Sequence, residues 1–325
     1  MSTRLSWSPA QSTLAVQASK GLHVINNLNY KCNYSFKASC ELFDKCVVPI
    51  LTYGSEIWGP YYHSSIENVL LKFCKKQLGV GSKAPSPAVL GECGRHSILI
   101  DCYTKCIKYW LKLINLPVNS LLRSCYNFLY SKCNLGAKNW ASKIKMILFQ
   151  FGFGYIWESQ SVLNHGDFVI HFRKRLIDCD TQTWHTNMLE MPKLNLYRMF
   201  KTTLSTEKYL LLNLPRRLQV ALTKFRISCH DFEIEIGRRY GVPKEDRLCK
   251  LCILENLNRV EDEFHVIFVC NAYRDYRQLY FDADQTQAHN MYSLIKLLRN
   301  TQELCITRLA NFLCCVSKVR SIKLA

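Results

Sequence analysis

Four residues near the end of the chain constrain its folding most, because their spacing is that of metal ligands. Cys249, Cys252, His265 and Cys270 form the pattern C-x2-C-x12-H-x4-C. Two thiolates separated by two residues can bind one side of a tetrahedral ion from a tight turn, and a histidine and a cysteine on a following element can complete the other side. No fifth candidate ligand accompanies them. The spacing therefore predicts one structural zinc ion that stabilises a small lobe.

The flanking residues favour this interpretation over a chance arrangement of free thiols. The chain has 17 cysteines, and a free cysteine behaves as a small hydrophobic residue. However, a turn-like stretch at 241–246 precedes the first pair, and a polar loop at 255–259 separates the pairs. Residues 260–263 read as the acidic first turn of a helix that carries the second pair. The other thirteen cysteines show no such spacing, and we expect no disulfide bonds.

Apolar residues recur at helical spacing through most of the chain. At 64–78, Ser64 and Glu67 resemble a capping box, and apolar residues then repeat at intervals of three and four. Similar patterns predict further helices over 96–114, 118–132, 139–150, 166–178, 196–212, 216–228, 262–280, 290–299 and 301–320. Strand signals are few, and the stretch 47–51 is interrupted by a proline. The predicted fold is mostly α, with a multi-helix region and a small C-terminal zinc-stabilised lobe.

The net charge of +18 at pH 7 is concentrated in one part of the chain. Residues 61–150 carry 13 basic and 3 acidic side chains. Lysine and arginine interleaved with aromatic rings suit a nucleic-acid strand, because cations bind phosphates and rings can stack on bases. The alternative is a solvated basic face over a helical core that contains the rings. We expect a polyanion partner for the segment, and a core position for most of its aromatic residues, namely Tyr61, Tyr62, Phe73, Tyr103, Tyr109, Trp110, Tyr126, Tyr130 and Trp140.

Other classes of protein find little support. The sequence has no nucleophile elbow, P-loop or dinucleotide fingerprint. Cys229 and His230 are adjacent in sequence, so they point in different directions on a helix, and we interpret His230 as a helix-end residue or a hydrogen-bond partner near the zinc lobe. No run of 18 apolar residues and no signal-peptide core occurs. We expect an intracellular protein, cytoplasmic or nuclear and not secreted, with no membrane partner.

Two stretches resemble a known family. Residues 42–59 follow the pattern V-x-P-x-L-x-Y-G-x-E-x-W-G, and residues 222–238 precede the four proposed zinc ligands. Together they are similar to the segment after the palm and to the C-terminal Cys-Cys-His-Cys motif of non-LTR (LINE-type) retrotransposon reverse transcriptases, in the same order, over about residues 1–280. The residues that carry this resemblance outside the metal motif are Pro49, Tyr53, Gly54, Glu56, Trp58, Gly59, His230, Gly237 and Arg238.

The resemblance implies a division of the chain into five regions. They are a segment bordering a palm at 1–40, a basic helical thumb-like region at 41–150, a helical linker at 151–236, the zinc lobe at 237–285 and C-terminal helices at 286–325. The palm itself is missing, since no Tyr/Phe-Ala-Asp-Asp turn occurs and two-metal catalysis needs such carboxylates. The nearest match, Asp282-Ala283-Asp284, follows the zinc motif and reads as a polar helix end. We therefore expect no enzymatic activity.

The function implied is that of a non-catalytic fragment that binds RNA or DNA, mainly through phosphates. Lys72, Lys75 and Lys76 would contact the template–primer backbone. Arg247, Lys250 and Arg259 would hold RNA or target DNA near the zinc lobe. A separate catalytic polymerase chain is a further candidate partner. Two alternatives stay open: a helical protein-interaction scaffold with an acidic partner, and a relic retroelement reading frame without a selected function.

Overall fold

The chain is built almost entirely from helices. The computed structural model describes residues 6–282 and 290–324. Within these residues, extended pairing is limited to two isolated bridges, Cys93 with Thr206 and Leu248 with Val260. The predicted mostly-α fold is confirmed. Of the stretch Asp282-Ala283-Asp284, the last two residues lie outside the described residues, as do the ends of the regions proposed at 1–40 and 286–325.

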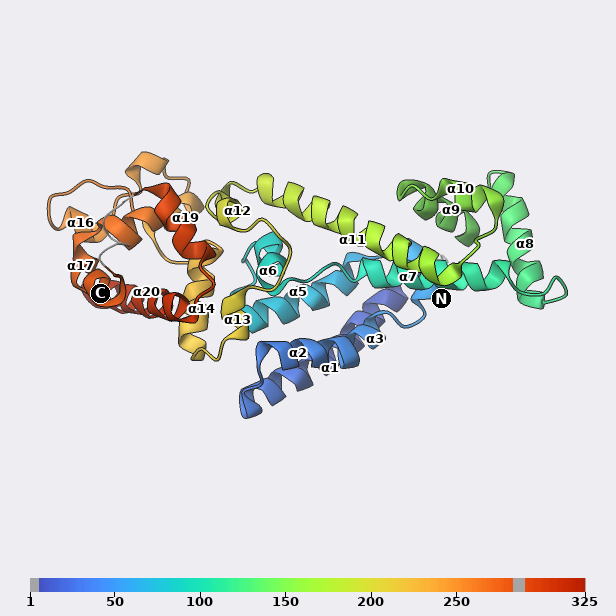
Figure 1. The fold of residues 1–325 in the computed structure, drawn as a ribbon, viewed down its shortest axis with the longest axis horizontal. Coiled ribbons are helices and arrows are strands. Elements are labelled where there is room, and N and C mark those ends of the chain that lie inside the picture. The colour runs from blue at the N-terminus through green and yellow to red at the C-terminus, as the bar shows by residue number, and fades with distance from the viewer. Residues whose placement is uncertain (1–5, 283–289, 325) are drawn as a thin grey trace. The chain divides into compact units, whose positions relative to one another are not determined.

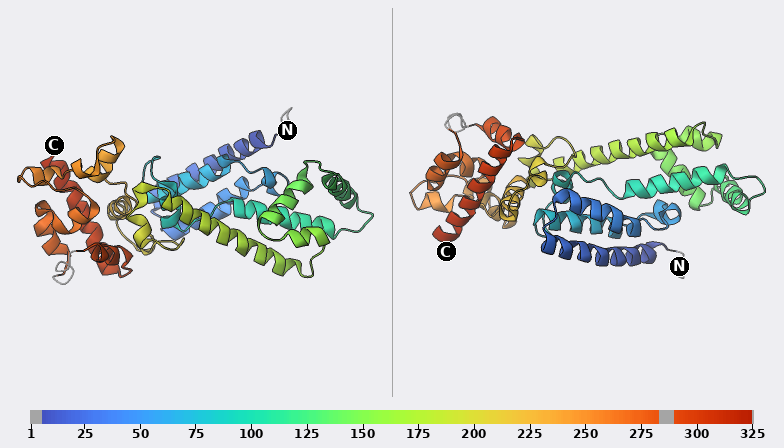
Figure 2. Two further views of the ribbon diagram at one scale, coloured as in Figure 1. Left: turned by 90° about the horizontal axis from the view of Figure 1, so that it is seen from above. Right: turned by 60° about the horizontal axis from the view of Figure 1, so that its bottom comes forward.

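The helices form two compact units (Figure 1). Unit 1 contains the residues up to Phe73 and His96–Thr183, and unit 2 contains Cys74–Arg95 and the residues from Trp184 onward. Helices α5 (Ser64–Leu78) and α11 (His165–Leu189) each begin in unit 1 and end in unit 2. Helix α11 is longer than the predicted 166–178; it and α1 can be followed along their length in Figure 2.

Unit 1 has a core of apolar and aromatic side chains. Helix α7 (Leu99–Ile114) buries Cys106, Ile107 and Trp110 on one face, as its period predicts. The Trp110 ring stacks on Trp157 with 6.1 Å between centroids, and its Nε1 donates to the Tyr126 hydroxyl over 2.9 Å. The other elements of unit 1 are α1 (Ser8–Cys32), α2 (Phe36–Leu42), η1 (Phe43–Val47), α3 (Val48–Leu51), α4 (Ser55–Trp58), η2 (Gly59–Tyr61), α8 (Leu121–Asn134), α9 (Trp140–Gln150) and α10 (Gly154–Ser159).

Two features of the N-terminal part were not anticipated from the sequence. Helix α1 buries mainly small or isolated apolar residues, such as Ala15, Ala18 and Leu22, so its periodic signal is weak. The stretch 47–51 is helical despite Pro49. A proline removes one backbone donor and crowds the preceding turn. The π-helical turn η1 lies just before it and widens the backbone there.

Unit 2 is made of shorter helices, and its most extensive helix pairing joins α14 (Arg216–Arg226) to α20 (Glu303–Lys323). The single helix predicted over 196–212 is wrong: two four-residue helices lie at its ends, and the chain between them is not helical because Lys201 turns inward to bind Glu207. The other elements are α6 (Ser86–Cys93), η3 (Pro192–Leu194), α12 (Tyr197–Phe200), α13 (Lys208–Leu211), α15 (Glu233–Arg239), η4 (Lys244–Asp246), α16 (Lys250–Ile253), η5 (His265–Val269), η6 (Asn271–Tyr273), α17 (Arg274–Tyr280) and α19 (Met291–Arg299).

Candidate metal centre

A tight turn positions the first two candidate ligands. The Cys249 backbone N–H donates to the carbonyl of Arg259 over 2.8 Å, next to the bridge between Leu248 and Val260. The chain then turns through α16, and the Leu257 N–H returns to the Cys252 carbonyl over 2.9 Å. The turn brings both sulfur atoms to its inner side, as the C-x2-C spacing predicts.

A π-helical turn positions the other two ligands. The sequence predicted one α-helix over 262–280, but five residues of an α-helix would separate the directions of His265 and Cys270 by about 140°. Instead, η5 is a π-helix in which the Cys270 N–H donates to the His265 carbonyl over 2.8 Å. Because this wider helix joins residues five apart by a hydrogen bond, the two side chains leave from nearly the same side. The backbone becomes extended at Cys270, where the expected helix breaks.

The four side chains form a buried cluster that could hold a metal ion. Their ligand atoms all lie within 4.8 Å of one another. Cys252 Sγ lies 3.8 Å from Cys270 Sγ and 3.3 Å from His265 Nε2, and Cys249 Sγ lies 3.9 Å from Cys270 Sγ. A tetrahedral zinc ion with ordinary bond lengths places two sulfurs about 3.8 Å apart, and a sulfur and a nitrogen about 3.5 Å apart. The observed distances between ligand atoms are close to these values.

The thiols of the cluster are in an environment that stabilises negative charge at some sulfurs and opposes it at others. Hydrogen bonding from Cys270 lowers the pKa of Cys249 to about 3, and burial raises the pKa of Cys252 to about 11. The hydrogen bond to Cys249 raises the pKa of Cys270. The backbone of Cys252 lowers the pKa of Cys249, and that of Ala272 opposes the rise in the pKa of Cys270. A divalent cation would let all three thiolates form together, because it replaces their protons.

A charged pair borders the cluster. Glu261 Oε1 lies 3.5 Å from Cys249 Sγ, and the same carboxylate is ion-paired with Arg320 of α20. Its second oxygen accepts from the Glu233 N–H over 2.8 Å. Burial raises the pKa of Glu261 to about 8, although Arg320 opposes this shift. On the other side, Arg277 donates to the Cys270 carbonyl over 2.6 Å. Such outer contacts fix the orientation of ligand side chains.

The cations predicted near this lobe are largely engaged within it. The Arg247 guanidinium is turned inward and donates to the carbonyls of Val242 and Ile234 over 2.8–3.0 Å. The Lys250 ammonium lies 2.9 Å from a Glu233 carboxylate oxygen, and Arg259 is exposed. The three side chains therefore have different surroundings and do not form one free cationic group.

The three lysines predicted on α5 also differ from one another. Lys72 and Lys76 are exposed. The Lys75 ammonium donates to the Ser82 carbonyl over 2.6 Å, and the side chain is half-buried. Two of the three side chains are thus available to a partner, and the third is held against its own chain.

The residues of the 42–59 motif shape a turn. Gly54 adopts a left-handed conformation with φ +66°, which favours glycine. This turn allows Trp58 Nε1 to donate to the Tyr53 carbonyl over 2.8 Å, and Trp58 is buried while the Tyr53 side chain is exposed. The tryptophan therefore closes the turn, which connects α3 to α4.

The end of the same motif packs against α7 and α9. A Cβ atom on Gly59 would lie 2.6 Å from Cys106 Sγ, so only glycine allows this close approach. The Glu56 carbonyl accepts from Trp140 Nε1 over 3.1 Å. Pro49 is exposed on α3. The motif residues thus include both packing positions and solvent-facing ones.

The motif residues that precede the metal cluster have structural contacts. His230 is buried, and its Nε2 lies 3.1 Å from Glu263 Oε1, which agrees with the predicted hydrogen-bonding role near the lobe. A Cβ on Gly237 would lie 2.6 Å from Arg247 Cγ, and Arg238 pairs with Glu235.

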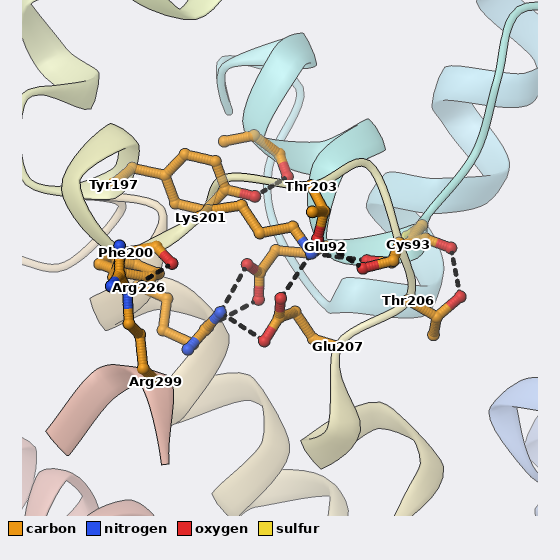
Figure 3. A network of polar contacts seen from close by, with 12 residues as sticks. Glu92, Cys93, Tyr197, Phe200, Lys201, Thr203, Thr206, Glu207, Arg226 and Arg299 are labelled. Carbon is orange, nitrogen blue, oxygen red and sulfur yellow. Dashed lines mark hydrogen bonds and ion pairs between the residues drawn. The ribbon is translucent and has the colours of Figure 1, made fainter. Parts of the chain in front are cut away.

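A buried network of four charges in unit 2 had no sequence signal (Figure 3). Arg226 of α14 binds both carboxylate oxygens of Glu92 over 2.8 and 3.1 Å, and Glu207 over 2.7 Å. The Lys201 ammonium lies 2.5 Å from the other Glu207 oxygen, and the Arg226 guanidinium lies 4.6 Å from the centroid of Phe200. Glu92 and Arg226 are 134 residues apart, so local patterns could not pair them.

Comparisons with known proteins add no relative. No family model, no curated protein and no solved structure matches the chain. Among the described residues, no helix is both long and apolar enough to cross a membrane.

Proposed function

We propose that this chain is a helical nucleic-acid-binding protein whose unit 2 is stabilised by one structural zinc ion. The observation that carries the proposal is the unequal exposure of charges within residues 61–150. Its acidic side chains are engaged within the protein, whereas most of its lysines face solvent. The segment therefore offers positive charge that its own carboxylates do not neutralise.

Each of the three acidic residues has internal partners. Glu67 accepts hydrogen bonds from the Tyr62 hydroxyl, the Ser97 hydroxyl and the Ile98 N–H. Asp101 pairs with Arg173, and Glu92 belongs to the buried network. In contrast, eight lysines of the segment are exposed: Lys72, Lys76, Lys83, Lys105, Lys108, Lys112, Lys132 and Lys138. Exposed cations of this density bind phosphates with release of counterions.

The aromatic residues of the segment favour phosphate contacts over base stacking. As expected, Phe73, Trp110 and Tyr126 are buried. Tyr103, Tyr109, Tyr130 and Trp140 pack against the same hydrophobic core as Trp110. Tyr61, which we expected in the core, is exposed, as are Phe128 and Phe149. Most rings of the segment are nevertheless not free to stack on bases, so binding would depend mainly on the backbone of the nucleic acid and show weak sequence preference.

The metal cluster supports a structural role for zinc in this proposal. Three sulfurs and one imidazole nitrogen form the closed donor set of structural zinc sites. When bound, the ion would fix the turn of Cys249 and Cys252 against the π-helical turn of His265 and Cys270. The ion and its four ligands would stabilise the lobe, and nucleic acid would bind to the exposed lysines of residues 61–150 instead.

The resemblance to LINE-type reverse transcriptases supports the same partner class. We propose that the chain derives from such an element. Purified protein would then retain labelled RNA without incorporating nucleotides on a primed template.

An acidic protein is the second candidate partner, and one observation favours it. Helix α8 exposes Leu121, Phe128 and the following Leu135 by 78%, 61% and 80% of their surfaces. Exposed apolar side chains surrounded by lysines are typical of a surface that binds another protein. Electrostatic association with such a partner would also weaken with salt.

A competition experiment distinguishes the two candidates. A fluorescent single-stranded RNA is titrated with the protein between about 50 and 200 mM salt, and polyglutamate or unlabelled RNA is then added. Backbone binding predicts that log K falls steeply and linearly with log salt. It also predicts that unlabelled RNA displaces the fluorescent RNA at a lower concentration than polyglutamate does, when both are counted as monomer units. Affinity that is insensitive to salt, or equal displacement by polyglutamate, would contradict the proposal.

A further inference from the structure

A hollow of about 300 Å³ lies within unit 1, between α3, α7 and α11. The three helices are labelled in Figure 1. Helix α3 provides one wall, with Val48 and Pro49. The opposite walls come from α7 and from Arg173 of α11. The residues lining the hollow are Val48, Pro49, Thr52, Asp101, Thr104, Lys105, Lys108 and Arg173.

The walls carry three cations and one carboxylate. The Lys105 ammonium donates to the Thr52 hydroxyl over 2.8 Å and to the Thr52 carbonyl over 3.1 Å, which fixes it at the rim and leaves one of its three donors unused. Arg173 Nη1 donates to Asp101 Oδ1 over 2.6 Å, and this contact uses part of the guanidinium. The four charged side chains around the hollow therefore sum to a net positive charge, while the surface that lines it is mostly apolar.

Lys108 is the side chain that the fold leaves without a partner. It is exposed and lines the hollow one helical turn beyond Lys105. Within residues 6–282 and 290–324, no hydrogen bond or ion pair engages its ammonium. A cation beside a hollow, next to two other cations, is repelled by them until an anion enters.

The same row of α7 continues beyond the hollow. Lys105, Lys108 and Lys112 are spaced by three and four residues, so they lie on one face of the helix. Lys112 lies about 6 Å along the helix axis from Lys108. This separation is comparable to that of successive phosphates in a single strand, so the row can follow a chain of phosphates out of the hollow.

We propose that this hollow binds one phosphate of a nucleic-acid strand, with Lys105, Lys108 and Arg173 as its contacts and Lys112 meeting the next phosphate. The inference rests on the proposed nucleic-acid-binding function and assigns its contacts. It replaces the lysines of α5 as the principal contacts. Asp101 opposes binding, because it neutralises Arg173 in the empty hollow.

Two substitutions with opposite expected effects test the assignment. Lys108→Gln removes a cation that has no internal partner, and Asp101→Asn removes the carboxylate that competes for Arg173. With single-stranded RNA, Lys108→Gln lowers the affinity about fivefold and reduces the salt slope by about 0.7, which corresponds to one phosphate contact. Asp101→Asn raises the affinity. Thermal unfolding checks that both variants are folded.

Lys174→Gln is the matched control. Lys174 is exposed on α11 directly after Arg173 but does not line the hollow. The substitution makes the same change in net charge on a neighbouring position. We expect its RNA affinity to stay close to that of the unchanged protein, with the salt slope unaltered.

The outcomes separate this inference from the proposed function. If the unchanged protein binds RNA with a steep salt slope but Lys108→Gln and Lys174→Gln behave alike, the hollow is not the contact and the general function stands. If the unchanged protein does not bind RNA, both fail. If inorganic phosphate binds the unchanged protein at millimolar concentration and Lys108→Gln abolishes that binding, but RNA affinity and its salt slope stay the same in Lys108→Gln, the hollow is a site for free phosphate, which overturns the nucleic-acid assignment.

Discussion

Unit 1 and unit 2 bury different kinds of polar side chain. In the described part of unit 1, the buried polar residues are all uncharged: Gln11, Ser39, Thr52, Ser55 and Thr104. The described part of unit 2 buries charged or ionisable ones as well, including Glu92, Lys201, Arg226, His230, Glu235, Glu261, Glu263, His265, Arg277 and Arg320, together with the three cluster thiols. The two units have comparable apolar cores but differ in what else those cores contain.

This difference implies different sources of stability. Unit 1 depends on apolar burial, which changes little with metal concentration or with pH near neutrality. Unit 2 depends on ion pairs whose loss would leave a charge uncompensated in the interior, and on a thiol cluster that favours a cation. Unit 2 should therefore lose more stability than unit 1 when the metal is removed or a buried ion pair is broken.

The largest expected effect is that of metal removal. Structural zinc sites contribute roughly 10 kcal/mol or more to folding in isolated zinc-binding domains. A strong chelator should therefore expose the backbone amides of 247–273 to hydrogen exchange, while amides of α7 in unit 1 stay protected. Exchange measured by mass spectrometry checks this. If chelation increased hydrogen exchange equally in both units, or in neither, the proposed difference between the units would be wrong.

Next in size is the loss of the buried arginine. Arg226→Ala leaves Glu92 buried without its partner, and we expect a cost of about 3–5 kcal/mol in the free energy of unfolding of unit 2. Arg173→Ala in unit 1 is the matched control. Its pair with Asp101 is accessible to solvent, with the two side chains 45% and 37% exposed, so the cost is about 0–1 kcal/mol. Urea unfolding measures both, and similar costs would contradict the distinction between the units.

A smaller effect is expected in the core of unit 1. Ile107 is fully buried, and Ile107→Val removes one methylene group at a cost of about 1 kcal/mol. Because the one cluster of metal-ligating side chains found among the described residues lies in unit 2, the cost should be the same with and without chelator. A cost that changes on chelation would show that unit 1 also depends on the metal cluster.

The smallest effect concerns pH. Burial raises the pKa of Glu67 in unit 1, so the folded state binds its proton more tightly than the unfolded state does. Stability of unit 1 should thus rise slightly as pH falls toward the ordinary carboxyl range, and Glu67→Gln should remove that rise. Metal ligation in unit 2 weakens over the same change, since protons compete for the thiolates. The urea midpoint of each unit, measured with a probe in that unit, should therefore change in opposite directions with pH. Midpoints that change in the same direction would contradict this prediction.

The sequence predicted those parts of the structure that depend on local spacing. The C-x2-C and H-x4-C pairs are close in sequence, and their convergence follows from a turn and one π-helical turn. Amphipathic helices such as α7 and α14 were found for the same reason. Helix α1 was missed because alanines on its buried face give little periodic contrast.

The remaining features depend on contacts between distant segments. The pairing of Glu92 with Arg226 spans 134 residues, and the inward turn of Lys201 that interrupts the predicted helix 196–212 follows from that network. The hollow likewise combines Pro49, Lys108 and Arg173 from three helices. No local sequence pattern specifies such contacts, because they depend on how the helices pack against one another.

Zinc content tests the central claim most directly. Elemental analysis of the purified, reduced protein should give one zinc ion per chain, and a Cys249→Ser, Cys252→Ser variant should give none. A folded protein that contains no zinc and takes up none when it is supplied would contradict the account. Unit 2 would then be held by its ion pairs and thiol packing alone.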